Sequence, residues 1–309
     1  MNNEAKIKLV AIFEALVVTF LWSTSFIIIK IGLVEITPIT FAGLRYFLAF
    51  IFFVPIITKK RYTEEIKKLS KENWKKLFLL GIIFYTLTQG FQFIGLSLLP
   101  AVTVSLILNF TPLVVAVLGM MFLKEKPGII QGLGIILFLI GVSLYFLPII
   151  ESSSSKLGIT IMIFGVFTNA CSSVMGRNIN MKKEISPIVV TFISMGIGSI
   201  LLLSIAVIVE DPIHINMRNV LVLIWLSLIN TAFAFTLWNL SLRTLKAIES
   251  SIINGTMLVQ IALLSWLFLD ERISLTKCFG LFIAASGVIL VQIKKTSSKP
   301  NRVVAEENK

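Results

Sequence analysis

The pentapeptide FLKEK at residues 122–126 returns as FLDER at residues 268–272, 146 residues later in an otherwise apolar sequence. The same shift aligns several small residues: Ala101 with Ala247, Gly134 with Gly280, and Gly141-Val142 with Gly287-Val288. A shared apolar background seldom matches a charged block and spaced glycines together. The sequence therefore predicts two related halves, residues 1–150 and 151–309, divided at the polar segment Glu151-Ser-Ser-Ser-Ser155.

Each half consists of apolar blocks of about 20 residues, the length an α-helix needs to cross the hydrocarbon of a bilayer. Of the 309 residues, 56% are hydrophobic and only 14% are charged, and the mean hydropathy is +0.94. Backbone polar groups must be paired inside lipid, so the blocks indicate helices. The expected spans are 7–29, 38–57, 77–98, 101–123, 129–148, 157–177, 187–209, 219–241, 247–269 and 276–293. The predicted fold is an all-α integral membrane protein with ten transmembrane helices.

Five spans per half give the two halves opposite directions in the bilayer, which predicts two inverted five-helix repeats. The placement of Lys and Arg supports this even count. Of the 28 basic residues, 22 fall on the side of the two termini, five fall on the other side, and Arg45 lies within a span. Cytoplasmic loops carry such an excess. We therefore expect a multi-pass protein of the cell membrane with both termini in the cytoplasm.

Several motifs resemble a known family. The first span contains Trp22-Ser-x-Ser-Phe26 and Lys30, the second starts with Pro38 and continues to Arg45-Tyr-Phe-Leu-Ala49, and the fourth contains Leu108-x-x-Thr111-Pro112 before the FLKEK block. These motifs resemble EamA-type members of the drug/metabolite transporter superfamily, over roughly residues 7–293. Two positions depart from the family pattern: Ser23 stands where glycine is usual, and Leu258 where proline is expected. The resemblance implies export or exchange of amino acids, related metabolites or drugs.

Two charged residues within the spans are candidate functional groups, because ionisable side chains inside a bilayer are costly. Glu14 lies two helical turns before Trp22. It is either a proton or cation site, or a carboxylate that reaches the inner surface beside Lys6 or Lys8. Arg45 either binds a substrate carboxylate or caps helix ends near Glu35. The sequence leaves both pairs of readings open.

Uncharged polar residues gather in the middle of several spans, and aromatic residues accompany them. The polar candidates are Tyr85, Gln89, Gln92, Asn109, Asn169, Asn230 and Asn254, and the aromatic wall candidates are Trp22, Phe26 and Trp238. Each amide taken singly is explained by hydrogen bonding between helices. Together they predict a polar central cavity that binds substrate.

Other classes of function find little support in the sequence. We expect no enzyme, because the spans lack paired carboxylates and the single histidine, His214, has no cysteine nearby. No Walker motif, metal site or cofactor is expected. The basic residues sit in short membrane loops, which argues against nucleic acid. The expected function is a secondary transporter of a small molecule by alternating access, with proton coupling and a homodimer left open. A multidrug or cation efflux carrier is the alternative, followed by a channel or sensor.

Overall fold

The computed structural model describes residues 3–111, 113–114, 129–146, 153–181, 184–211, 215–241, 244–245, 253–271 and 273–292. Within these ranges the regular elements are all helices, two of them π-helical segments labelled η. They are α1 (Asn3–Gly32), α2 (Pro38–Ile57), α3 (Lys60–Lys67), α4 (Lys71–Leu80), η1 (Gly81–Thr88), α5 (Gln89–Leu98), α6 (Ala101–Leu108), α8 (Ile129–Phe146), α9 (Ser153–Met181), α10 (Pro187–Val209), α11 (Met217–Ser227), η2 (Leu228–Phe233), α12 (Ala234–Ser241), α14 (Met257–Phe268) and α15 (Leu275–Gln292). The block 122–126, Pro112, His214 and Ala247 lie outside the described residues.

In the described part of the chain, six helices are long and apolar enough to cross a membrane: Lys6–Gly32, Pro38–Ile57, Lys71–Leu98, Lys156–Asn180, Pro187–Val209 and Met217–Trp238. Three shorter apolar helices accompany them, at Gly132–Tyr145, Ile253–Phe268 and Leu275–Leu290. Large apolar side chains also cover the outside of the bundle; Val207 and Ile208, for example, are more than 80% exposed. Such a surface is stable in hydrocarbon and not in water. The protein is thus an all-helical membrane protein, while the number ten remains a prediction, because the expected span 101–123 is described only as far as residue 114.

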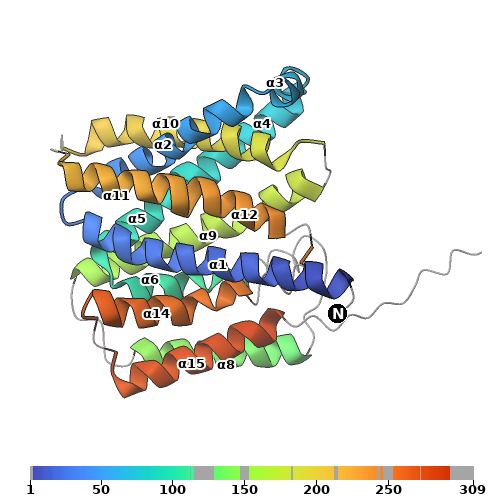
Figure 1. Ribbon diagram of the computed structural model, residues 1–309. Coiled ribbons are helices and arrows are strands. Elements are labelled where there is room, and N and C mark those ends of the chain that lie inside the picture. The colour runs from blue at the N-terminus through green and yellow to red at the C-terminus, as the bar shows by residue number, and fades with distance from the viewer. Residues whose placement is uncertain are drawn as a thin grey trace, which may run out of the picture.

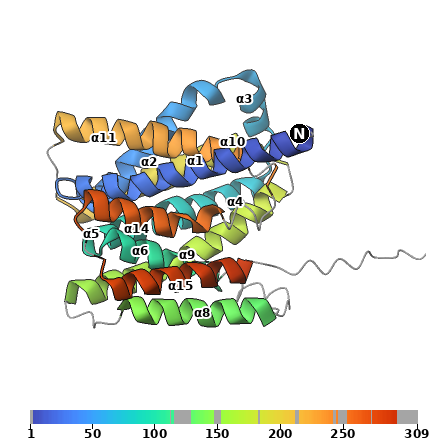
Figure 2. The ribbon, with the colours of Figure 1, turned by 60° about the horizontal axis from the view of Figure 1, so that its bottom comes forward.

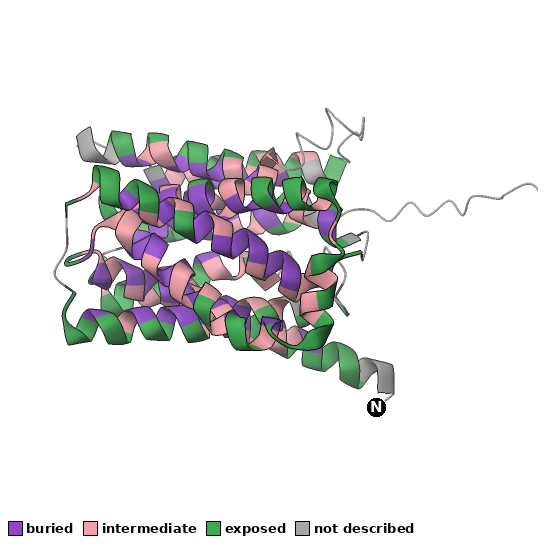
Figure 3. Cartoon of the chain, turned by 90° about the horizontal axis from the view of Figure 1, so that it is seen from above, coloured by how far each residue is buried: buried purple, intermediate pink, exposed green. Residues whose placement is uncertain are grey.

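The long helices run side by side with alternating direction (Figure 1). We call the end where α1 begins and α3 lies the N-terminal face, and the end where α1 finishes the opposite face. The helices α8 and α15 pair with each other along one edge of the bundle, as Figures 1 and 2 both show. Buried and exposed residues alternate along the helices, so most helices have both a buried and an exposed side (Figure 3).

The centre of the bundle depends on close contact between α10 and both α2 and η1. At Gly198 an added Cβ would stand 2.4 Å from the Tyr85 Cβ and 2.6 Å from the Gly81 carbonyl oxygen. The hydroxyl of Thr86 donates to the Gly198 carbonyl at 3.1 Å. Small residues let membrane helices approach in this way, since van der Waals contact replaces the hydrophobic effect inside lipid.

The two π-helical segments occupy matching places in the chain. Shifting η1 by the 146 residues of the sequence repeat places it over residues 227–234, and η2 covers Leu228–Phe233. Each segment therefore interrupts a long composite helix at its middle, α4–η1–α5 in one case and α11–η2–α12 in the other. Single π turns within α-helices are rare and often occur at functional sites.

Candidate functional site

Arg45 lies at the middle of α2 and is buried, with 4% of its surface exposed. Its Nε donates to the Thr231 hydroxyl at 2.9 Å, one terminal nitrogen donates to the Ser25 hydroxyl at 2.8 Å, and the other approaches the Asn230 carbonyl at 3.4 Å. The guanidinium thus joins α1, α2 and η2. In return the Ser227 hydroxyl donates to the Arg45 carbonyl at 2.8 Å. The π-helical turn of η2 presents Asn230 and Thr231 together to this one side chain.

All three acceptors of the Arg45 guanidinium are neutral. Within the described part of the chain no carboxylate forms an ion pair with it. Beside it, the Asn230 side-chain oxygen is buried and has no hydrogen-bond partner among the residues that the structure describes. The Asn230 amide nitrogen donates to the Leu21 carbonyl and to the Thr24 hydroxyl. A buried cation is normally paired with a charge. The arrangement can therefore accept an anionic group that the described protein does not supply.

A second polar pair extends this centre towards η1. The Tyr46 hydroxyl donates to the Gln89 side-chain oxygen at 2.6 Å, and both residues are buried. The rings of Tyr46 and Tyr85 lie edge to face with centroids 5.5 Å apart. The structure thus brings four of the predicted residues, Arg45, Tyr85, Gln89 and Asn230, into one region between η1 and η2.

Aromatic side chains lie next to this region on the side of the N-terminal face. The Trp22 ring is 5.3 Å from Phe235 and 5.2 Å from Trp238, and Phe84 is 6.3 Å from Phe235. Phe235 also lines a cavity of about 300 Å³. The other lining residues are Phe53, Arg61, Tyr62, Ser186, Pro187, Ile188, Thr191, Thr236 and Leu240. The cavity therefore lies between the α3 region and the aromatic cluster, with Phe235 in common.

Glu14 is half-buried on α1, closer to the N-terminal face than Trp22. It makes no hydrogen bond or ion pair with the described part of the chain. Its helical neighbours Ala11 and Ala15 pack against Leu245, with Trp238 at the edge of the same cluster. Glu14 thus lies on the turn of α1 that packs beside Trp238.

The remaining predicted residues lie apart from the Arg45 region. Phe26 is buried in the main apolar core. The Asn109 amide donates to the Ser105 carbonyl of its own helix at 2.8 Å, and the Asn169 amide donates to the Thr111 hydroxyl at 3.2 Å. Gln92 is half-buried on α5, and Asn254 is exposed.

Sequence reasoning missed the hydroxyl groups that bind Arg45. Ser25 and Thr231 are short side chains that hydrogen-bond to their own helix in most membrane proteins, and only the bundle shows that they face a guanidinium. A weak signal was present for Ser25, which lies in the Trp22–Phe26 motif. Another pair connects the halves nearby, where Ser23 donates to the Gln260 side-chain oxygen at 2.9 Å.

Known proteins resemble this chain over nearly its full length. An uncharacterized transporter of Archaeoglobus fulgidus is 27% identical and aligns over 89% of this chain and 94% of that protein. A probable amino-acid metabolite efflux pump of Escherichia coli K12 is 24% identical over 89% of this chain and 92% of that protein. A solved crystal structure with 14% identity superposes with a TM-score of 0.67 over 91% of this chain and 96% of the other. That likeness shows the fold alone.

The family comparison covers both halves of the sequence. The pattern of the EamA-like transporter family matches residues 9–147 and 156–293, which is most of the chain. The two relatives described above are named a transporter and an efflux pump. The chain therefore belongs to the EamA-like transporter family, and it is a membrane transporter.

Proposed function

We propose that this protein is a secondary transporter that moves small metabolites bearing a carboxylate, such as amino acids, across the cell membrane by alternating access. The observation that carries the proposal is the buried Arg45 guanidinium, which is held by neutral acceptors from α1 and η2. We propose further that two inverted five-helix repeats, residues 1–150 and 151–309, expose this site to either side, with both termini in the cytoplasm and no catalysis.

The energetics of Arg45 support a substrate-binding role. On insertion scales, an arginine at the centre of a membrane helix costs about 3 kcal/mol. A helix cap near the surface would not require this cost. A carboxylate matches the guanidinium fork with two parallel hydrogen bonds, and such pairs are stronger than bonds to hydroxyls. Substrate binding would therefore replace the weak neutral contacts by a strong charged one.

The cavity near the N-terminal face supports a route to this centre. A solute entering it would meet Phe235 and then the Trp22 ring before it reached Arg45. Aromatic rings suit the apolar part of an amino-acid-like solute. The Escherichia coli relative is named a probable amino-acid metabolite efflux pump, and this name agrees with a solute of that class.

The test is counterflow in proteoliposomes with a panel of the twenty radiolabelled amino acids. We expect saturable exchange of at least one of them. In Arg45→Gln we expect kcat/KM for that solute to fall about tenfold or more, because a hydrogen bond to a charged group contributes about 1.5–3 kcal/mol. Arg45→Lys keeps the positive charge but loses the planar guanidinium fork. Its kcat/KM should therefore lie between that of the unmodified protein and that of Arg45→Gln.

A substrate analogue separates binding from misfolding. The methyl ester of the transported amino acid lacks the negative carboxylate, so it should compete poorly with the free amino acid in the unmodified protein. In Arg45→Gln the two compounds should compete equally. If the ester competes as well as the free amino acid in the unmodified protein, Arg45 does not bind the carboxylate.

One arrangement favours the alternative of a cation or multidrug carrier. Glu14 lies on α1 between Ala11 and Ala15, which share a cluster with Trp238, and Trp238 packs against Trp22. A carboxylate with aromatic faces is the usual environment for an organic cation. Under this alternative, Glu14→Gln would abolish transport of a lipophilic cation such as tetraphenylphosphonium, and Arg45→Gln would not.

A further inference from the structure

The opposite face carries a carboxylate that joins the two halves of the sequence at a helix end. Glu271 follows α14, and its Oε1 accepts the backbone N–H of Ala101 at 2.8 Å while Oε2 accepts that of Val102 at 3.4 Å. These are the first residues of α6, whose amides have no partner within the helix. The structure thus shows the amides of α6 as the partners of Glu271.

The turn before α6 is also held by a cation. The Lys30 ammonium, near the end of α1, donates to the carbonyl oxygens of Leu96 and Leu99 at 2.7 Å each. These carbonyls close α5, and Leu99-Pro100 is the turn from α5 to α6. A positive group at a helix C-terminus and a negative group at a helix N-terminus both complement the helix dipoles. The α5–α6 turn is therefore fixed by two opposite charges from different helices.

The backbone before Glu271 is shaped for this contact. Asp270 has φ of 52°, the only positive φ at a non-glycine residue in the described chain. The Glu271 N–H returns to the Ser265 carbonyl at 3.3 Å, and the Leu269 N–H binds the same oxygen at 2.9 Å. Aspartate tolerates the left-handed region better than most residues. This reversal ends α14 and leaves the Glu271 carboxylate against the start of α6.

We propose that Glu271 is a gating residue for transport: its contact with the start of α6 holds the pathway closed at the opposite face. The inference rests on the alternating access proposed above. Val104 and Ile107 of α6 belong to the same apolar core as Tyr46 and Tyr85, which lie beside Arg45, so α6 extends from the opposite face into the core that adjoins the Arg45 region. The cavity lies on the other side of that region. Opening towards the opposite face requires α6 and the end of α14 to separate, which breaks the Glu271 contact.

Two other carboxylates at this face also join the halves, and they provide the comparison. Glu210 accepts the Ile39 N–H at 2.8 Å and the Thr40 N–H at 2.7 Å at the start of α2. However, α2 and α10 pack closely along their length; a Cβ at Gly43, for example, would stand 2.8 Å from a Leu203 methyl carbon. Such packed helices move together, so Glu210 stabilises a static contact.

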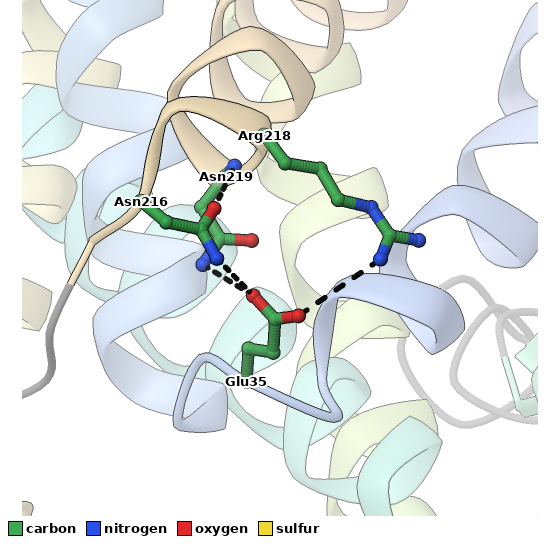
Figure 4. Close-up of polar contacts among 4 residues, drawn as sticks. All are labelled: Glu35, Asn216, Arg218 and Asn219. Carbon is green, nitrogen blue, oxygen red and sulfur yellow. Dashed lines mark hydrogen bonds and ion pairs between the residues drawn. The ribbon is translucent and has the colours of Figure 1, made fainter.

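The third carboxylate is Glu35, in the turn between α1 and α2. It accepts the side-chain amides of Asn216 at 2.8 Å and Asn219 at 2.9 Å, and Arg218 lies 3.9 Å away (Figure 4). This cluster is partly exposed and connects α11 to the end of α1. Among the described residues, the hydrogen bonds and the ion pair of Glu35 reach neither α6 nor α14. Of the three carboxylates, Glu271 alone is bonded to the short helix α6, which ends in turns on both sides.

The experiment measures access to the buried side of α14 next to Glu271, whose N–H binds the Ser265 carbonyl. Ser265 on α14 is fully buried, and its hydroxyl has no hydrogen-bond partner in the described ranges, so Ser265→Cys is a small reporter change. It is introduced into protein carrying Cys171→Ala and Cys278→Ala, placed in nanodiscs so that a charged maleimide reaches both faces. Labelling should be slow in this background. We expect labelling to be about tenfold faster in Glu271→Gln, because the free energy lost with a helix cap corresponds to a change of about that size in the open population.

Matched variants make the result specific. Glu210→Gln makes the same chemical change at the same face and should leave labelling of Ser265→Cys unchanged. Asp270→Val disfavours the left-handed turn and should reproduce the effect of Glu271→Gln, whereas Asp270→Gly should not. Equal labelling rates in Glu271→Gln and Glu210→Gln would overturn the gate. Should the transported amino acid still alter labelling in that case, alternating access stands and only the gate assignment fails; should nothing alter it, both fail.

Discussion

Glu14 is the residue whose role most needs a direct test, because two readings of it were left open. A carboxylate that is partly buried in a membrane helix can exchange a proton for substrate. We expect Glu14→Gln to abolish uptake driven by a pH gradient while leaving substrate counterflow, which needs no proton, intact. Both are measured in proteoliposomes, and Glu14→Asp should retain pH-driven uptake. Equal pH dependence in the Gln variant and the unmodified protein would remove Glu14 from coupling.

At the same scale, charged residues were easier to predict than their partners. Arg45 is conspicuous in an apolar sequence. The free-energy cost of a charge in lipid was enough to predict it as a functional residue. Its hydroxyl ligands, Ser25 and Thr231, are common in membrane helices and were not predicted. The role of Glu271 was missed for a similar reason, because its partners are backbone amides of α6 that no side-chain pattern reveals.

At the scale of elements, helix extents followed from hydropathy and proline. The expected spans 38–57 and 187–209 coincide with α2 and α10, each of which begins at a proline, where its missing N–H is tolerated. The internal irregularities were not predictable: η1 and η2 interrupt apolar stretches without a glycine–proline signal common to both. At η1, the close approach of Gly198 to Tyr85 shows tight packing that hydropathy does not reveal.

The α8–α15 pair gives a stability prediction at this scale. At Gly141 of α8, an added Cβ would stand 2.3 Å from the Ala284 nitrogen and 2.6 Å from the Gly280 carbonyl oxygen, while at Gly132 of the same helix nothing lies within 4 Å. Backbone atoms cannot yield as side chains do. We therefore expect Gly141→Ala to destabilise the protein by about 1–3 kcal/mol, and Gly132→Ala to leave it unchanged or slightly more stable. Thermal unfolding in detergent measures both; equal melting temperatures would show that the helices separate readily.

For the whole molecule, the central prediction is that the two halves face opposite ways. Five spans per half reverse the second copy, so equivalent loops must lie on different sides of the membrane. Val34, in the turn between α1 and α2, is 84% exposed, and Glu184, in the turn between α9 and α10, is also exposed. These turns follow the first helix of each half, and in the structure they lie at the opposite face and the N-terminal face respectively.

Impermeant maleimide on intact cells tests this arrangement in protein that carries Cys171→Ala and Cys278→Ala. With both termini in the cytoplasm, Val34→Cys should be labelled from outside, and Glu184→Cys only after the membrane is permeabilised. Lys60→Cys on α3 should behave like Glu184→Cys, because the loop that contains it holds eight of the basic residues. Labelling of both turns from the same side would make the halves parallel. Two parallel halves would not offer Arg45 to each compartment through equivalent gates, and the transport mechanism proposed from them would then be wrong.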